Sequence, residues 1–230
     1  MMDLRTKRAL IDYLAGYVTP ARIEKMRRVL DRRTRHLCIV MEDIYQSHNA
    51  SAVLRSCDCF GIQDVHIIEN KNRYQVNPDV ALGASKWLSI HKYNQQSHNT
   101  ADCLKQLKQK GYRIVATSPH KDDCLLEDLA IDQKTALLFG TELKGLTTSA
   151  LEMADAFMKI PMTGFTESLN ISVSAAICLY HLAPRIRSSQ VNWQLSEAEQ
   201  AEILLEWIKT SLKNPQAMID RFARENKAAH

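Results

Sequence analysis

Glycine is scarce in this sequence, and its scarcity excludes several common nucleotide sites. Only seven of the 230 residues are glycine, and no two glycines are separated by a single residue. A Rossmann dinucleotide fingerprint and a P-loop both need glycine-rich turns, so neither is present. The metal motif HExxH and the nucleophile motif GxSxG are missing as well.

Long apolar runs and paired cysteines are also absent. No apolar run approaches the roughly 20 residues of a membrane span, and charged residues interrupt the N-terminal segment where a secretory signal would be apolar. The six cysteines include one C-x-C pair, Cys57 and Cys59, with no second pair at metal-binding spacing. We therefore expect a cytoplasmic protein with reduced thiols, no membrane segment and no metal site.

Positive charge is concentrated at the N-terminus. Residues 1–36 contain ten lysines and arginines but four acidic residues, although the net charge of the whole chain is only +4. A basic surface of this kind suits a nucleic acid. A solvated helix face explains the same pattern, and charge taken alone favours that interpretation.

The apolar pattern divides the chain into three parts. Residues 1–33 predict two short helices. Residues 34–187 alternate short apolar runs with amphipathic segments, which is typical of a mostly parallel sheet with helices on its faces. Residues 188–230 begin with a polar linker and predict two further helices, the first opened by a capping box from Ser196 to Glu199. The expected fold class is therefore α/β, with helical extensions on either side.

The boundaries expected within the central part follow from the apolar runs and their flanking residues. Strands are expected at 37–41, 65–68, 87–91, 112–117, 136–139 and 157–160. Helices are expected at 49–60, 100–110 and 168–182. We expect the last helix to end or kink near Pro184, because proline lacks an N–H and clashes with the preceding turn.

Three motifs lie just beyond predicted strands. They span residues 48–55, residues 139–146, and residues 160–162 together with 168–174. In an open α/β sheet, ligands bind outside the carboxyl ends of the strands. Three such loops from one chain can therefore converge on one site.

Single residues in these motifs have both a structural and a functional interpretation. Gly140 can allow a ligand close to the backbone, or it can simply form a turn. Asn49 and Ser168 can cap helices or contact a ligand. Arg55 is either a surface side chain or a cation held near a phosphate or a developing oxyanion. Spacing alone does not decide between these alternatives.

Together, the motifs resemble the SPOUT superfamily of RNA methyltransferases, and most of all the ribose 2′-O-methyltransferases that modify a guanosine in the tRNA D-loop. The first family motif, an asparagine followed six residues later by an arginine, matches Asn49 and Arg55. The second, G-x-E-x-x-G, matches residues 140–145. The third, I-P-M then S-L-N-x-S-V, matches residues 160–162 and 168–173. The likeness covers nearly the whole chain.

The resemblance implies S-adenosylmethionine as cofactor, a C-terminal trefoil knot in the domain at 34–187, a tRNA substrate and a homodimer with its active site near the dimer interface. The positions that match the cofactor surroundings are Thr117, Gly140, Ile160, Ser168 and Leu169. The positions that match the reaction residues are Asn49, Arg55, Glu142 and Asn170. A guanidinium has a pKa above about 12 and is a poor base, so we expect Arg55 to orient the ribose through a phosphate and to stabilise the forming alkoxide.

The predicted activity is methylation of a tRNA ribose, most simply at guanosine 18. One alternative is a relative that methylates ribosomal RNA or another tRNA position. A second alternative is a non-catalytic RNA-binding relative, against which the intact motifs argue. The sequence departs from the family at the end of the third-motif helix, where Pro184 precedes Arg185 and Arg187.

Overall fold

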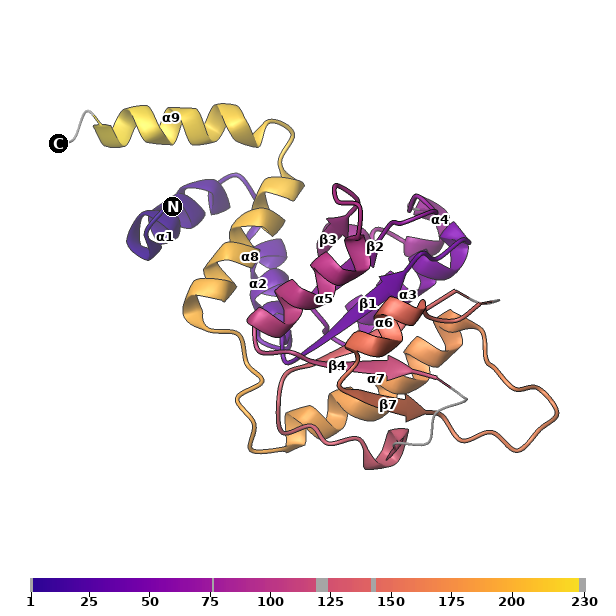
Figure 1. Cartoon of the computed structure of the whole chain (residues 1–230). Helices are drawn as coiled ribbons and strands as arrows, with labels where there is room; N and C mark the ends of the chain where they lie inside the picture. The colour runs from indigo at the N-terminus through magenta and orange to yellow at the C-terminus, as the bar shows by residue number, and fades with distance from the viewer. Residues whose placement is uncertain (1, 76, 119–123, 142–143, 228–230) are drawn as a thin grey trace. The chain divides into compact units, whose positions relative to one another are not determined.

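The computed structural model describes residues 2–75, 77–118, 124–141 and 144–227. These residues form two compact units (Figure 1). One unit comprises residues 34–193, and the other joins the N-terminal residues up to 33 with those from 194 onward. The two helical ends of the chain thus fold with each other. Among the described residues, no helix is long and apolar enough to cross a membrane.

The larger unit is built on a seven-stranded sheet in which every strand pair is parallel. Its strands are β1 (Leu37–Glu42), β2 (Asp64–Ile68), β3 (Ser89–Tyr93), β4 (Arg113–Thr117), β5 (Cys124–Leu125), β6 (Thr135–Phe139) and β7 (Ala156–Lys159). They lie in the order β3-β2-β1-β6-β4-β7-β5. Both β1 and β6 are buried along their whole length, as continuous apolar runs in a covered parallel sheet should be. The predicted α/β class is confirmed.

Helices cover both faces of this sheet because successive strand residues point to opposite sides. Ile39 on β1 packs in a core cluster with α3 (Ser47–Cys59) and α7 (Ile171–Ser188). Its neighbour Val40 packs in a second cluster with α5 (Asn99–Gln109) and α6 (Thr148–Met153). The short helix α4 (Pro78–Ala81) lies between β2 and β3 in the chain. These helices pack on the faces of the sheet, so they leave the carboxyl ends of the strands available for a site.

Helix α7 begins later than its sequence predicted. We expected it to start at Ser168, with that serine as a possible cap. Asn170 is the N-cap instead, because its Oδ1 accepts hydrogen bonds from the backbone N of Ser172 (2.8 Å) and from the Ser172 hydroxyl (2.6 Å). Residues 168 and 169 are thereby left in the preceding loop.

The predicted end of α7 was wrong, because the helix continues through Pro184 to Ser188. Pro184 is exposed, so the hydrogen bond that it cannot donate is lost on the solvent side of the helix. The helical turn after Pro184 is held by contacts with other parts of the chain. Ile186 is buried in the core, and the guanidinium groups of Arg185 and Arg187 donate to the carbonyl oxygens of Leu129 (3.0 Å) and Phe60 (2.6 Å). These two arginines are therefore engaged with the main chain.

The smaller unit consists of four helices, α1 (Leu4–Ala15), α2 (Pro20–Leu30), α8 (Glu197–Ser211) and α9 (Pro215–Lys227). Helices α1 and α2 pack against α8, whose predicted capping box is present. The basic N-terminal block is not one solvated face. Arg33 is 1% exposed, and its guanidinium lies 5.4 Å from the centre of the Trp207 ring. Exposed cations of α2 remain, among them Lys25, Arg27 and Arg28.

Candidate functional site

A cavity of about 370 Å³ opens at the carboxyl ends of three neighbouring strands, β6, β4 and β7. Its volume falls within the roughly 300–1,000 Å³ of small-molecule sites. The last residue of each strand and the residue after it line the cavity, at 139–140, 117–118 and 159–160. The loop that leads into α7 closes another side. This is the zone in which an α/β sheet holds its ligands.

The five positions that match the cofactor surroundings all line this cavity. They are Thr117, Gly140, Ile160, Ser168 and Leu169. They come from three strand ends and one loop, so only the folded sheet brings them together.

The glycine at position 140 is required by a close approach of backbone to backbone. The N of Thr141 donates to the carbonyl of Gly145 (3.0 Å), and the N of Gly145 donates back to the carbonyl of Thr141 (2.9 Å). A Cβ placed on Gly140 would lie only 2.2 Å from the carbonyl carbon of Gly145. Gly145 itself has φ 65°, a conformation that favours glycine. Glu142, predicted to take part in the reaction, lies outside the described residues.

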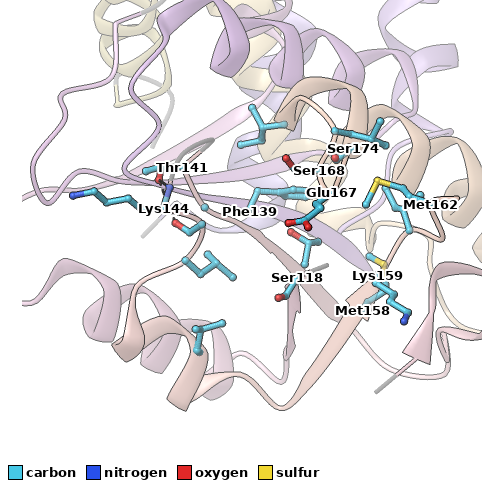
Figure 2. Close-up of a pocket in the computed structure, with 18 residues that line it drawn as sticks. Ser118, Phe139, Thr141, Lys144, Met158, Lys159, Met162, Glu167, Ser168 and Ser174 are labelled. Atoms are coloured by element: carbon cyan, nitrogen blue, oxygen red, sulfur yellow. Dashed lines mark hydrogen bonds between the residues drawn. The ribbon is translucent and has the colours of Figure 1, made fainter. Parts of the chain in front are cut away.

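The cavity combines an apolar floor with a few polar groups. Its apolar side chains include Phe139, Leu146, Leu151, Met158, Ile160 and Leu169. The polar side chains of Ser118, Glu167 and Ser168 lie around Phe139 (Figure 2). A ligand with a flat apolar ring and a polar end fits such a lining.

Sequence reasoning missed three polar residues of this lining that lie outside the three motifs, namely Ser118, Lys159 and Glu167. Ser118 had a usable signal, because it directly follows a predicted strand. Lys159 lies inside a predicted strand, where nothing marks it as a lining residue, and Glu167 had no signal because its position depends on the path of the loop before α7.

Asn49 and Asn170, from the first and third motifs, meet beside the cavity. The Nδ2 of Asn170 donates to the Oδ1 of Asn49 over 3.1 Å, and the Nδ2 of Asn49 donates to the Oε1 of Gln46, also over 3.1 Å. Asn49 lies within the first turn of α3, whose N-cap is Gln46, so it does not cap that helix. Both neighbours of Asn170, at 169 and 171, line the cavity. The asparagine pair thus ties the cavity loop to α3.

Arg55 lies outside the cavity. It is six residues beyond Asn49 on α3, about 9 Å along the helix axis. Its side chain is exposed, and within the described part of the chain its guanidinium makes no hydrogen bond or ion pair. The chain alone therefore presents Arg55 to solvent, where a phosphate can reach it.

The cysteine on α7 offers no nucleophile to this cavity. Cys178 lies on α7, and burial raises the pKa of its thiol to about 12. It therefore stays protonated at neutral pH. Cys38, Cys57 and Cys103 are buried as well.

Comparisons with known proteins agree with this geometry. The model of the SpoU rRNA Methylase family matches residues 36–180. A tRNA (guanosine(18)-2'-O)-methyltransferase of Borreliella burgdorferi is 44% identical over 206 residues, covering 90% of this chain and 93% of the relative. The protein of the same name from Escherichia coli is 34% identical over 197 residues, covering 82% of each chain.

A solved structure is also similar to this chain. The crystal structure of an Aquifex aeolicus TrmH/SpoU tRNA modifying enzyme superimposes with a TM-score of 0.74 at 30% identity, covering 84% of this chain and 97% of that one. The likeness extends beyond the residues that the family model matches. The resemblance read from the three sequence motifs is confirmed.

Proposed function

Because this chain belongs to the SpoU methylase family, we propose that it transfers a methyl group from S-adenosylmethionine to the ribose 2′-oxygen of guanosine 18 in tRNA. Named relatives with this activity match most of its length at 44% and 34% identity. The observation that supports the proposal most is the cavity at the ends of β6, β4 and β7, which all five matched cofactor positions line. A cytoplasmic location belongs to the proposal, because free thiols stay reduced there.

The cavity residues fit S-adenosylmethionine, which supplies a methyl group on a positively charged sulfur. The apolar side chains suit the adenine ring, and the main chain at 139–140 and 117–118 offers peptide groups for its polar edge. Glu167 lies in the middle of the lining and provides a negative charge for the ammonium group of the cofactor (Figure 2). Family membership also carries the proposal of a trefoil knot in the C-terminal part of a methyltransferase domain at 34–187, flanked by extensions at 1–33 and 188–230.

The proposed reaction residues divide into positioning and charge stabilisation. The bond between Asn49 and Asn170 holds the loop at 168–170 beside α3 and so fixes one wall of the cavity. Arg55 orients the ribose through a neighbouring phosphate and stabilises the negative charge that develops on the 2′-oxygen. Glu142 is proposed only from its match to the family motif.

Analysis of modified nucleosides tests the function. We expect tRNA incubated with the protein and S-adenosylmethionine to gain 2′-O-methylguanosine. A transcript with 2′-deoxyguanosine at position 18 is the matched control and should gain no methyl group, because it lacks the acceptor oxygen. Methylation of that transcript would move the target to another position. Labelling of ribosomal RNA alone would favour the ribosomal alternative, and no labelling of either RNA would favour a non-catalytic relative.

The proposal includes a homodimer formed through α7. Val173, Ile177 and Tyr180 are 45%, 36% and 71% exposed and recur at spacings of four and three residues, so they form one apolar stripe on this helix. Phe60 extends the stripe, since its ring packs edge-on against Tyr180 at 6.2 Å between centroids. Contiguous exposed apolar surface is typical of a protein contact.

Sedimentation tests the dimer. At micromolar concentration we expect about twice the chain mass of 26.2 kDa. Ile177→Asp should shift the protein toward monomer, because it places a charge in the apolar stripe. Leu82→Asp is the control, since it places the same charge on an exposed apolar residue outside α7. A wild-type monomer with full activity would refute the dimer.

A further prediction concerns the exposed cations of α2. Replacing Lys25, Arg27 and Arg28 with glutamine should weaken binding to all tRNAs alike, because phosphate contacts position an RNA without reading its sequence. Each lost contact should also reduce the slope of log affinity against log salt by roughly 0.7–0.9. Binding measured at several salt concentrations checks this, with cofactor affinity expected to stay unchanged. Equal slopes for both proteins would mean that these residues are only a solvated face.

A further inference from the structure

A second hollow lies at the same edge of the sheet, beyond the carboxyl ends of β2 and β3. It encloses about 860 Å³ and is lined by residues 69–75 and by residues following β3, up to Asn99. Seven of its twelve lining residues are asparagine or glutamine and three are lysine or arginine, against one glutamate. We call it the amide groove. The proposed cofactor cavity shares no residue with it.

One wall of the amide groove is held rigid by Asp43. Its Oδ1 accepts hydrogen bonds from three consecutive backbone N–H groups, those of Asn70 (2.7 Å), Lys71 (2.8 Å) and Asn72 (3.2 Å). The Nδ2 of Asn72 donates back to the carbonyl of Asp43 (2.8 Å). Asp43 has φ 55°, an uncommon conformation for a residue other than glycine. Strain of this kind is typical of functional sites, where it fixes the direction of neighbouring groups.

The floor of the groove is fixed by a buried carboxylate. Glu69 is 8% exposed, and it accepts hydrogen bonds from the backbone N of Tyr74 (3.0 Å) and from the Nδ2 of Asn94 (2.7 Å). The Nζ of Lys92 lies 3.7 Å from the same carboxylate and 5.3 Å from the centre of the Tyr74 ring. These contacts therefore link the segment after β2 to the segment after β3 on the buried side of the groove.

Other groups of the lining are not used by the fold. Lys71 and Arg73 are exposed, and their side chains make no ion pair or hydrogen bond with the residues that the structure describes. The amides of Gln75 and Gln96 likewise make no side-chain hydrogen bond within those residues. Two unpaired cations suit phosphates. Amides donate and accept at once, as the edge of an unpaired base requires.

We propose that the amide groove binds an unpaired nucleotide of the tRNA, with Lys71 and Arg73 on its phosphates and Gln75 and Gln96 on its base edge. The inference rests on the proposed function, because it assumes a tRNA substrate. Strand β1 alone separates β2 from β6, so the nearest strands of the two sites are about 10 Å apart at a strand spacing of ~4.8 Å. The bound nucleotide therefore lies close to the methylated one.

The double variant Lys71→Gln/Arg73→Gln tests this site. We expect the KM for tRNA to rise at least about fivefold and the salt dependence of binding to flatten, because two phosphate contacts are lost. The kcat and the affinity for S-adenosylmethionine should stay near wild type. Arg113→Gln/Lys134→Gln is the matched control, because it removes the same two charges at the opposite end of β4 and β6 and should leave the KM unchanged.

A second variant separates base reading from charge. Gln75→Ala/Gln96→Ala should keep the salt dependence but change the relative KM values of tRNAs that differ next to guanosine 18. Wild-type methylation of tRNA with KM values unchanged in both double variants would overturn the inference while leaving the proposed function intact. Failure of the wild type to methylate any tRNA would overturn the proposed function itself. Tight binding of an acidic peptide, abolished by Lys71→Gln/Arg73→Gln while tRNA kinetics stay normal, would assign the groove to a protein partner instead.

Discussion

Arg55→Ala is expected to lower methyl transfer by about a hundredfold or more while cofactor affinity stays unchanged. The guanidinium is exposed on α3 and makes no ion pair or hydrogen bond in the described structure, so its removal leaves no unpaired group and opens no core cavity. It does not line the cofactor cavity. Its loss should therefore act on the transition state, in which the 2′-oxygen gains negative charge.

Single-turnover assays and calorimetric titration with S-adenosylmethionine measure these two effects separately. Arg55→Lys is the informative control, because it keeps the charge but loses the planar fork that binds a phosphate through two donors. A partial loss in Arg55→Lys would support phosphate orientation as the main role. Near-normal turnover in Arg55→Ala would remove Arg55 from the mechanism.

Gly140→Ala is expected to weaken S-adenosylmethionine binding by about a hundredfold or more. The new Cβ would lie 2.2–2.4 Å from three main-chain atoms of Gly145 and Leu146. Backbone atoms cannot move aside as the end of a side chain can, so the reciprocal hydrogen bonds between Thr141 and Gly145 would break. That loop forms one wall of the cavity, and a small displacement of a binding wall is costly.

Gly164→Ala is the matched control. It lies in the loop between β7 and α7, and its nearest contact for an added Cβ is the N of Thr166 at 4.0 Å. Calorimetry should give wild-type cofactor affinity for this variant. Circular dichroism should show intact secondary structure for both variants, because position 140 lies after β6 rather than inside the sheet. Tight cofactor binding by Gly140→Ala would show that the loop is not needed in its present form.

The sequence by itself determined the parallel sheet and most of its helices. Buried strands such as 37–42 and 135–139 are continuous apolar runs, and local signals such as the capping box at Ser196 mark where helices begin. These features depend on neighbouring residues, so periodicity and composition suffice to predict them. The three motifs identified the family for a related reason, because their order and spacing can be recognised in the sequence without any knowledge of the fold. The seven-strand order itself is not encoded locally.

At several residues the sequence allowed more than one structural role, and only the tertiary structure decided between them. Asn170 caps α7 and bonds to Asn49 across 121 positions of sequence, a contact that no local pattern contains. Pro184 remains inside a helix because distant carbonyl groups hold the turn after it. From the sequence, Arg33 is one of several basic residues expected at the surface, but packing against Trp207 buries it. In each case the deciding energy comes from long-range packing and hydrogen bonding, which override local propensity once the chain is folded.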